Sequence, residues 1–283
     1  MDQIEPSVYA RQKSNVQLLA MQSISIIKSY SKSYDLIVDL GCGDGDVTKN
    51  FLAKHIPHKR IVAIDCLPEM LDYARTNNPD SSIDYQLQDM GRKWPDMSPR
   101  VRQLDCKVDL IFANLSFGYI PDKRQLMDTI GHLLSTGGMI HANIELKEDI
   151  NKRLASYGWP MKKQWYESPE KQADNWRQCL QSMDNQLLIK QFETIDVCWT
   201  TDRQKMIDFM PILISKFRKF FNDPKDFDSE LNDHLWDTAF DAMVNPLAIG
   251  GPNPRAWQQF LADPNVKEVK RYHQLLRITA IKQ

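Results

Sequence analysis

The chain has 283 residues, of which 42 % are hydrophobic and 26 % are charged. A chain of this length can bury a core of its own, so we expect it to fold stably alone. The 36 Lys and Arg residues nearly balance the 37 Asp and Glu residues, which gives a formal net charge of -1. No summed positive field therefore favours nucleic acid or an anionic membrane, and a small molecule is the expected partner.

Five cysteines are spread along the chain without a C-x-x-C pair: Cys42, Cys66, Cys106, Cys179 and Cys198. An odd number without paired spacing argues against a disulfide framework and against a zinc cage, so we expect reduced thiols and no bound metal. The polar start of the sequence lacks the apolar segment of a secretion signal, and no run approaches the roughly 20 apolar residues that span a membrane. We expect a soluble, cytoplasmic monomer or homodimer.

Short apolar runs alternate with amphipathic stretches through the first half of the chain. The runs predict strands at Leu36–Leu40, Arg60–Asp65, Ile83–Asp89, Val108–Ser116 and Gly138–Ile144. The stretches between them predict helices at Asp46–His55, Pro68–Thr76 and Asp122–Leu134, with Asp122 as the N-cap of the last. Alternation of strand and helix is typical of a parallel sheet with helices on both faces.

The second half is mostly helical, charged and rich in Trp and Phe. Two further strand-like runs, Glu193–Thr201 and His273–Lys282, would complete a sheet of seven strands. We therefore predict an α/β fold with a Rossmann-like, seven-stranded, mostly parallel sheet and a helical cap. Its predicted parts are an N-terminal helix and ligand-binding core at residues 1–146, a helical substrate cap at 147–192 and 202–262, and closing strands of the core sheet at 193–201 and 272–283.

The strongest chemical signal is the stretch VDLGCGDGDVT, residues 38–48, in which a strand ends in an acid before a glycine-rich turn. Glycine at positions 41, 43 and 45 lets the backbone turn tightly and approach a ligand closely. A nicotinamide-binding G-x-G-x-x-G motif would need glycine where this chain has Asp46. Carboxylates at 39, 44 and 46 disfavour a pyrophosphate there and favour a ligand that carries a sulfonium and an ammonium group.

Two more acids follow the next two predicted strands. Asp65 ends one strand about twenty residues after the glycine turn, where a carboxylate accepts hydrogen bonds from ribose hydroxyls. Asp89 ends the next, where its oxygen suits the exocyclic amine of adenine while Met90 offers apolar contact to the ring. Because parallel sheets bind ligands at the carboxyl ends of their strands, these acids predict an adenosine pocket.

In combination, VDLGCGDG, AID, LQD and DLIFANLSFGYIPD resemble the successive motifs of class I S-adenosylmethionine-dependent methyltransferases. The resemblance implies a site with four parts. Asp39, Gly41, Cys42 and Gly43 would surround the methionine moiety; Asp65 would hold the ribose, with Cys66 and Met70 flanking the adenosine; Asp89 and Met90 would meet adenine; and Asn114 and Ser116 would face the reacting methyl group.

Within that superfamily the chain resembles the juvenile hormone acid and trans-aconitate methyltransferases, both of which esterify small carboxylic acids. The opening YARQKSNVQ is similar to their N-terminal helix, which nominates Gln17 beside the substrate, and HQLLRITAIK is similar to their closing strand. The insect enzymes usually have His and Trp after strand four, where this chain has Gly118 and Tyr119. A different acid, or a different nucleophile, is the alternative.

The resemblance implies carboxyl O-methylation, with a lipid-like acid related to juvenile hormone acid or farnesoic acid as a candidate substrate. A carboxylate is already ionised at pH 7, so no general base is expected, and Gln17 and Tyr119 would act by positioning. The expected substrate contacts are Gln17, Phe117, Tyr119, Trp159 and Trp165. Two readings from other classes stay open: a cofactor-binding regulatory protein without turnover, and a nicotinamide oxidoreductase.

Overall fold

A computed structural model of the chain describes residue 6 and residues 14–146, 167–182, 187–218, 229–244 and 253–283. The described residues form two compact units. The first, called the core unit here, contains residues 14–146, 173–182, 187–195 and 275–283. The other, called the helical unit, contains residues 167–172, 196–218, 229–244 and 253–274.

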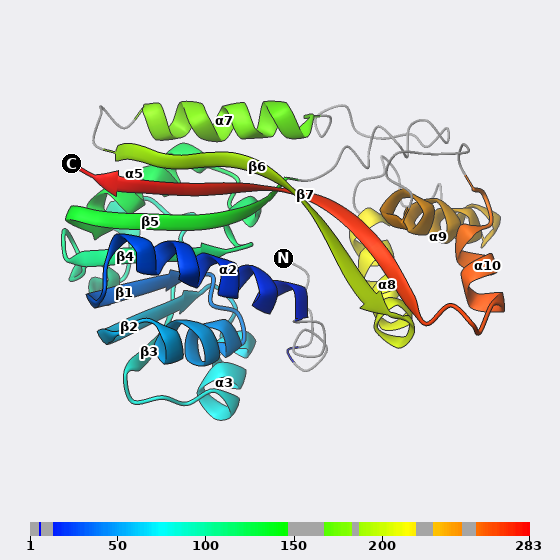
Figure 1. Ribbon diagram of the computed structural model, residues 1–283, viewed down its shortest axis with the longest axis horizontal. Helices are drawn as coiled ribbons and strands as arrows, with labels where there is room; N and C mark the ends of the chain where they lie inside the picture. Colours follow the sequence, from blue (N-terminus) through cyan, green and yellow to red (C-terminus); the bar gives the residue numbers. More distant parts are fainter. Residues whose placement is uncertain (1–5, 7–13, 147–166, 183–186, 219–228, 245–252) are drawn as a thin grey trace. The chain divides into compact units, whose positions relative to one another are not determined.

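A seven-stranded sheet forms the centre of the core unit (Figure 1). Its strands are β1 (Tyr34–Leu40), β2 (His58–Asp65), β3 (Ile83–Leu87), β4 (Val108–Asn114), β5 (Leu134–Leu146), β6 (Leu187–Asp202) and β7 (Glu268–Lys282). They lie in the order β3-β2-β1-β4-β5-β7-β6, and the pairs from β3 to β5 are parallel. The predicted seven-stranded, mostly parallel sheet is confirmed. The parallel pairing brings the carboxyl ends of β1, β2 and β4 to one edge.

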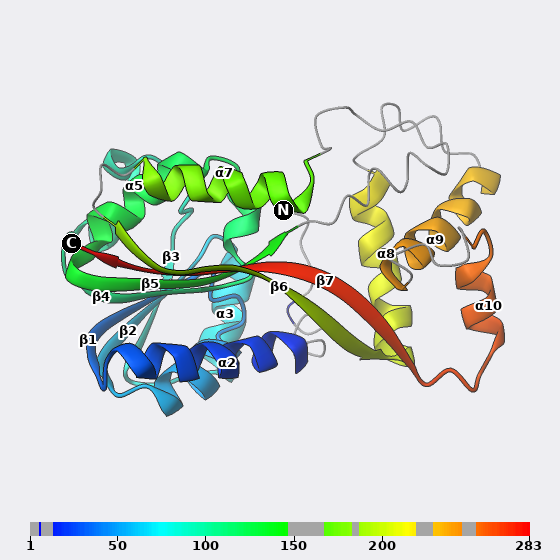
Figure 2. The same ribbon diagram turned by 45° about the horizontal axis from the view of Figure 1, so that its top comes forward.

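Helices cover both faces of this sheet because successive strand residues point in opposite directions. Ile37 belongs to one buried cluster, with residues of α2 (Ser14–Tyr30) and α3 (Pro68–Asn77). Its neighbour Val38 belongs to the other, with residues of α4 (Pro99–Arg102), α5 (Lys123–Leu133) and α7 (Pro169–Gln181). Figure 2 shows α2 and α3 on one side of the sheet and α5 and α7 on the other.

The three predicted helices of the first half are present. The segment from residue 46 to 55 is helical, with a wider π-helical turn at Thr48–Ala53 in its middle. Helix α3 begins at Pro68, whose fixed φ suits a first helical position. Helix α5 follows Asp122, whose carboxylate accepts a hydrogen bond from the Gln125 amide at 3.0 Å. The predicted N-cap is therefore confirmed.

One stretch lies differently from the predicted division of the chain. Residues 173–182 and 187–195, which the sequence grouped mainly with the cap, belong to the core unit. On α7, the side chains of Trp176, Cys179 and Leu180 are buried in the core cluster, and β6 begins at Leu187 rather than at 193. A charged helix with one apolar stripe has the same sequence pattern whether it packs in a cap or on a sheet. Its partner is therefore decided by the tertiary packing.

The helical unit has its own buried cluster. It is built from α8 (Arg203–Arg218), α9 (Ser229–Val244) and α10 (Ala256–Ala262). Trp257 is buried between Trp236, Phe240 and Phe260, so this aromatic residue is core. The guanidinium of Arg203 donates to the carbonyls of Phe260 and Leu261, which supplies partners for the open end of α10. Within the described ranges, no helix has both the length and the apolar character of a membrane span.

Candidate functional site

The glycine-rich turn after β1 is shaped by three residues with positive φ. These are Gly41 at 81°, Gly43 at 55° and Gly45 at 77°. A Cβ atom on Gly41 would lie 2.2 Å from the Cβ of Ser116, and one on Gly45 would lie 2.5 Å from the hydroxyl oxygen of Tyr85. Glycine is therefore required at 41 and 45 by both conformation and space.

Neighbouring strands and loops hold this turn in place. The amides of Gly41 and Cys42 donate to the carbonyl of Ile64 on β2, at 2.8 and 3.0 Å. The side-chain amide of Asn78 donates to the carbonyl of Asp44 at 2.8 Å, and Tyr85 donates its hydroxyl hydrogen to the carbonyl of Asn78 at 2.9 Å. The buried backbone groups of the turn thus have fixed partners, which makes the site rigid before any ligand arrives.

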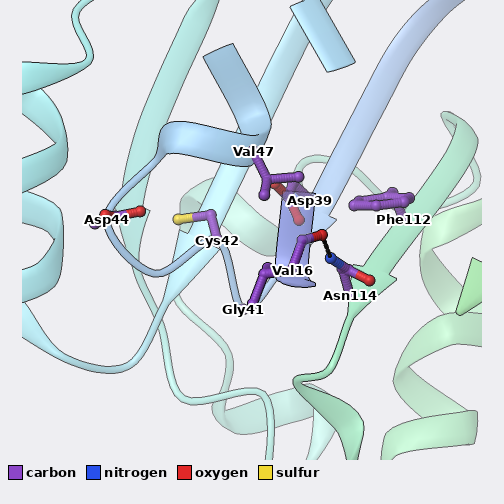
Figure 3. Close-up of a pocket in the computed structure, with 8 residues that line it drawn as sticks. All are labelled: Val16, Asp39, Gly41, Cys42, Asp44, Val47, Phe112 and Asn114. Atoms are coloured by element: carbon purple, nitrogen blue, oxygen red, sulfur yellow. Dashed lines mark hydrogen bonds between the residues drawn. The ribbon is translucent and has the colours of Figure 1, made fainter. Parts of the chain in front are cut away.

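A pocket opens beside the turn, at the carboxyl ends of β1 and β4 (Figure 3). Its lining residues are Val16, Asp39, Gly41, Cys42, Asp44, Val47, Phe112 and Asn114. Asp39 and Asp44 are each only 2 % exposed, so both carboxyl groups that line the pocket are held away from bulk water. Across the pocket, the side-chain amide of Asn114 donates to the carbonyl of Val16 on α2 at 3.0 Å, which ties the start of α2 to β4.

Asp39 has a strongly perturbed carboxyl group. Burial raises the pKa of Asp39 to about 7, repulsion from Asp65 adds to the rise, and a 2.6 Å hydrogen bond donated by Thr48 works against it. Near neutral pH the group is therefore divided between its acid and its carboxylate. A cation in the pocket would favour the carboxylate, because opposite charges attract strongly where water is excluded.

Asp65 lies at the end of β2, beside the same turn. Its two oxygens accept the amide hydrogens of Gly43 at 2.8 Å and Leu67 at 3.0 Å. Burial raises the pKa of Asp65, and these backbone hydrogen bonds oppose the rise. Each carboxylate oxygen has two acceptor sites, so the same group can still accept from a pair of ligand hydroxyls. The structure thus brings Asp65 next to the glycine turn.

The other nominated cofactor residues differ in exposure. Asp89 is exposed and accepts the amide hydrogen of Gly91 at 2.8 Å, while Met70 and Met90 are buried. Burial raises the pKa of the Cys66 thiol, and it raises that of Cys42 further, so both remain protonated thiols, and Cys42 lines the pocket. Ser116 donates its hydroxyl hydrogen to the carbonyl of Leu40, which joins the ends of β4 and β1.

Gln17 lies on α2, directly after the pocket residue Val16. Its amide nitrogen donates to Asp46 at 2.8 Å, and the amide of Asn50 donates to the other oxygen of the same carboxylate at 2.8 Å. The structure therefore brings Gln17 to Asp46, at the start of the helical segment 46–55, where one of its two amide hydrogens is engaged. The amide oxygen and the second amide hydrogen of Gln17 can still bond to a substrate.

The aromatic residues after β4 separate into a core residue and a surface residue. Phe117 is fully buried and stacks on Trp176 with ring centroids 6.0 Å apart. Tyr119 is 50 % exposed, and its partial burial together with the Glu145 carboxylate raises its pKa to about 12. The Tyr119 hydroxyl therefore keeps its proton at physiological pH. Trp159 and Trp165 lie outside the described residues.

Four residues of the site were not nominated from the sequence. Val16, Val47 and Phe112 line the pocket, and Thr48 holds Asp39. Three of them stand inside the quoted motifs, Val47 and Thr48 in VDLGCGDGDVT and Phe112 in DLIFANLSFGYIPD. Together, the buried acids, the close-approach glycines and Asp65 fit a ligand that carries positive charge at one end and a ribose beside it.

Comparison with known proteins agrees with this geometry. Residues 38–140 match the family described as a methyltransferase domain. The trans-aconitate 2-methyltransferase of Escherichia coli O1:K1 is 34 % identical over 145 residues, which cover 50 % of this chain and 50 % of the relative. That of Azoarcus sp. BH72 is 35 % identical over 104 residues, covering 37 % of this chain and 36 % of the relative. The chain thus spans about half the length of the curated relatives it matches.

Solved structures show the same fold at low sequence identity. The YcgJ protein of Bacillus subtilis superposes with a TM-score of 0.56 at 13 % identity, covering 93 % of this chain and 98 % of that one. A Bacillus halodurans C-125 protein described as a methyltransferase has a TM-score of 0.54 at 13 % identity with the same coverage. Residues 38–140 therefore match a methyltransferase domain and are similar to the corresponding part of the trans-aconitate enzymes, and the chain shares the fold of these solved structures.

Proposed function

We propose that this chain transfers a methyl group from S-adenosylmethionine to a small carboxylic acid. The observation that carries the proposal is the pocket of buried carboxylates, Asp39 and Asp44, beside a glycine turn and Asp65 in a class I methyltransferase core. The names of the relatives support a small acid as the substrate class.

Each part of the cofactor has residues of matching chemistry. Asp39, with the turn residues Gly41, Cys42 and Gly43, suits the charged methionine end, and Asp65 suits the ribose hydroxyls. Cys66, Met70, Asp89 and Met90 would hold the adenosine, and Asn114 and Ser116 would lie beside the methyl group. When bound, the cofactor supplies an electrophilic methyl group on a sulfonium.

The chain's own task would then be alignment and exclusion of water. A carboxylate nucleophile carries its negative charge at pH 7, so no proton needs to be removed during the transfer. Tyr119 keeps its hydroxyl hydrogen at this pH and suits the role of a donor to the acid. Gln17 and Phe117 are the further candidates on the substrate side, Phe117 by holding the backbone of its loop from the core. Trp159 and Trp165 complete the proposed substrate set.

Two classes of carboxylic acid are candidate substrates. A compact polyacid such as trans-aconitate and a lipid-like acid such as farnesoic acid or juvenile hormone acid are the two classes that the resemblance indicates. The Gly118 and Tyr119 pair after β4 departs from the insect pattern, and this departure keeps another nucleophile, or binding without turnover, as the second candidate.

Calorimetric titration with S-adenosylmethionine, followed by a radiolabelled methyl-transfer screen over both acid classes, tests the proposal. We expect binding, label in one class, and loss of both in Asp65→Ala. Binding without label in any acid would support the regulatory alternative, whereas a chain that binds no S-adenosylmethionine would contradict the proposal as a whole. Nicotinamide fluorescence in the same preparation tests the oxidoreductase reading.

A further inference from the structure

A continuous network of hydrogen-bonded polar side chains extends from β7 to the wall of the pocket. The guanidinium of Arg277 donates through Nε to Oδ1 of Asn143 at 2.9 Å, and Nδ2 of Asn143 donates to Oδ1 of Asn114 at 3.0 Å. Nδ2 of Asn114 then donates to the carbonyl of Val16 in the pocket wall at 3.0 Å. Asn114 and Asn143 are register partners on β4 and β5.

The same network of side chains contacts α2 at two further points. Nδ2 of Asn143 donates to the hydroxyl of Ser23 at 2.8 Å, and a terminal nitrogen of Arg277 donates to Oε1 of Gln22 at 3.0 Å. Val16, Gln22 and Ser23 all belong to α2, which lies along this face of the sheet in Figure 2. Three acceptors of one helix are therefore served by three residues on β4, β5 and β7.

The side chains of this network are buried, so a hydrogen bond that is lost there cannot be replaced by one to water. Ser23 and Asn143 are 0 % exposed and Arg277 is 8 % exposed, so water cannot replace a missing partner. An unsatisfied polar group at such a depth costs more than the net gain of an ordinary hydrogen bond. Arg277 also has an ionic neighbour, a Glu193 carboxylate oxygen 3.8 Å away.

The order of donors and acceptors follows from Arg277. A guanidinium has only donors, so Asn143 must turn its oxygen toward Arg277 and its nitrogen toward Asn114. Asn114 must then present its own oxygen to Asn143, which leaves its nitrogen facing the carbonyl of Val16. The charge on β7 thereby sets the orientation of an amide that lines the pocket.

We propose that Arg277 and Asn143 are positioning residues of the pocket, which orient the Asn114 amide and so fasten the start of α2 across it. The hydrogen bond from Asn114 that holds the start of α2 is present in the protein without ligand. Its consequence for S-adenosylmethionine affinity rests on the proposed function, because Val16 and Asn114 both line the pocket.

Asn143→Asp is the sharpest test, since it keeps the size of the side chain and the acceptor for Arg277 but removes the amide donor to Asn114 and Ser23. The Ser23 hydroxyl can donate to the new carboxylate instead, so that contact survives. Asn114 must then rotate its amide toward Asp at 143, and its oxygen will oppose the carbonyl of Val16. We expect amide hydrogen exchange over residues 16–22 to become about fivefold faster or more, and S-adenosylmethionine to bind about fivefold more weakly, from the loss of one net hydrogen bond.

Tyr34→Phe is the matched control. It removes a buried hydrogen bond from the Tyr34 hydroxyl to the carbonyl of Ile27, at the other end of α2. We expect it to lower the free energy of unfolding without changing exchange over residues 16–22. In an Asn114→Ala background, Asn143→Asp should have little further effect on binding, because the two substitutions break the same path.

Unchanged exchange over residues 16–22 in Asn143→Asp would overturn the inference. If that variant does not fold, Arg277→Lys and Arg277→Met make the same comparison: the lysine keeps a donor-only group and should preserve slow exchange, and equally slow exchange in the methionine variant would overturn the inference. A wild-type chain that binds no S-adenosylmethionine would contradict the proposed function instead, while the exchange data would still decide on the fastening of α2.

Discussion

Replacing Asp39 by Asn tests the electrostatics of the pocket in the chain without ligand. The side chain of Asp39 is buried beside Thr48 and near Asp65, and its pKa is about 7 against an ordinary value of 3.8. Because the folded protein holds this proton more tightly than the unfolded chain, protonation of Asp39 stabilises the fold. The substitution to Asn keeps the shape and an acceptor for the Thr48 hydroxyl while removing the titration.

The sign and size of the effect follow from the two pKa values. The stabilisation from protonated Asp39 is complete below pH 4 and is lost as the pH rises through 7. The full difference of about three pKa units corresponds to roughly 4 kcal/mol, of which about 2.5 kcal/mol is lost between pH 5 and pH 8. Wild type should therefore weaken by about that amount relative to Asp39→Asn over this interval.

Urea unfolding of both proteins at pH 5, 6, 7 and 8, without ligand, measures this difference. Asp72→Asn removes one exposed carboxylate on α3 and is the control for the change in net charge. A free-energy difference between wild type and Asp39→Asn that stays flat from pH 5 to pH 8 would refute the reasoning. A flat difference would mean that Asp39 is ionised over the whole interval.

Three further outcomes follow from particular contacts. Gly41→Ala should abolish S-adenosylmethionine binding and lower the free energy of unfolding by about 1–3 kcal/mol. The reason is that the φ of 81° at Gly41 and the 2.2 Å approach to Ser116 leave no room for a methyl group. Calorimetry measures the binding, and thermal unfolding measures the stability. Phe117→Ala should destabilise the chain by about 3–5 kcal/mol as a buried aromatic, measured by thermal unfolding, whereas Tyr119→Phe should reduce methyl transfer in the acid screen. Arg203→Ala should speed amide exchange in α10 and leave exchange in β1 unchanged, since it removes donors only from the carbonyls at the end of α10; equal exchange in α10 would show that these bonds contribute nothing.

Much of the core was predictable because its signals are local. The continuous apolar runs of β1 and β4 mark strands buried on both faces, and Asp122 marks the start of α5 through its own hydrogen bond. The acids after β1 and β2 were expected to meet because parallel strands end at one edge, and Asp65 does accept the amide hydrogen of Gly43.

The division of the second half was less predictable. Helix α7 carries one apolar stripe, and nothing in that stripe distinguishes a sheet from a helical cap as its partner. The same holds for Phe117, which the motif places after β4 but which the packing of Trp176 draws fully into the core.

The sequence by itself determined the order of strands and helices, the glycine turn and the placement of acids at strand ends, because each depends on a short window of residues. Only the tertiary structure decided that Arg277 reaches Asn143, that Gln17 meets Asp46, and that burial shifts the proton affinity of Asp39. Those features arise where segments distant in the chain exclude water together, and no local pattern of residues records which distant group will arrive.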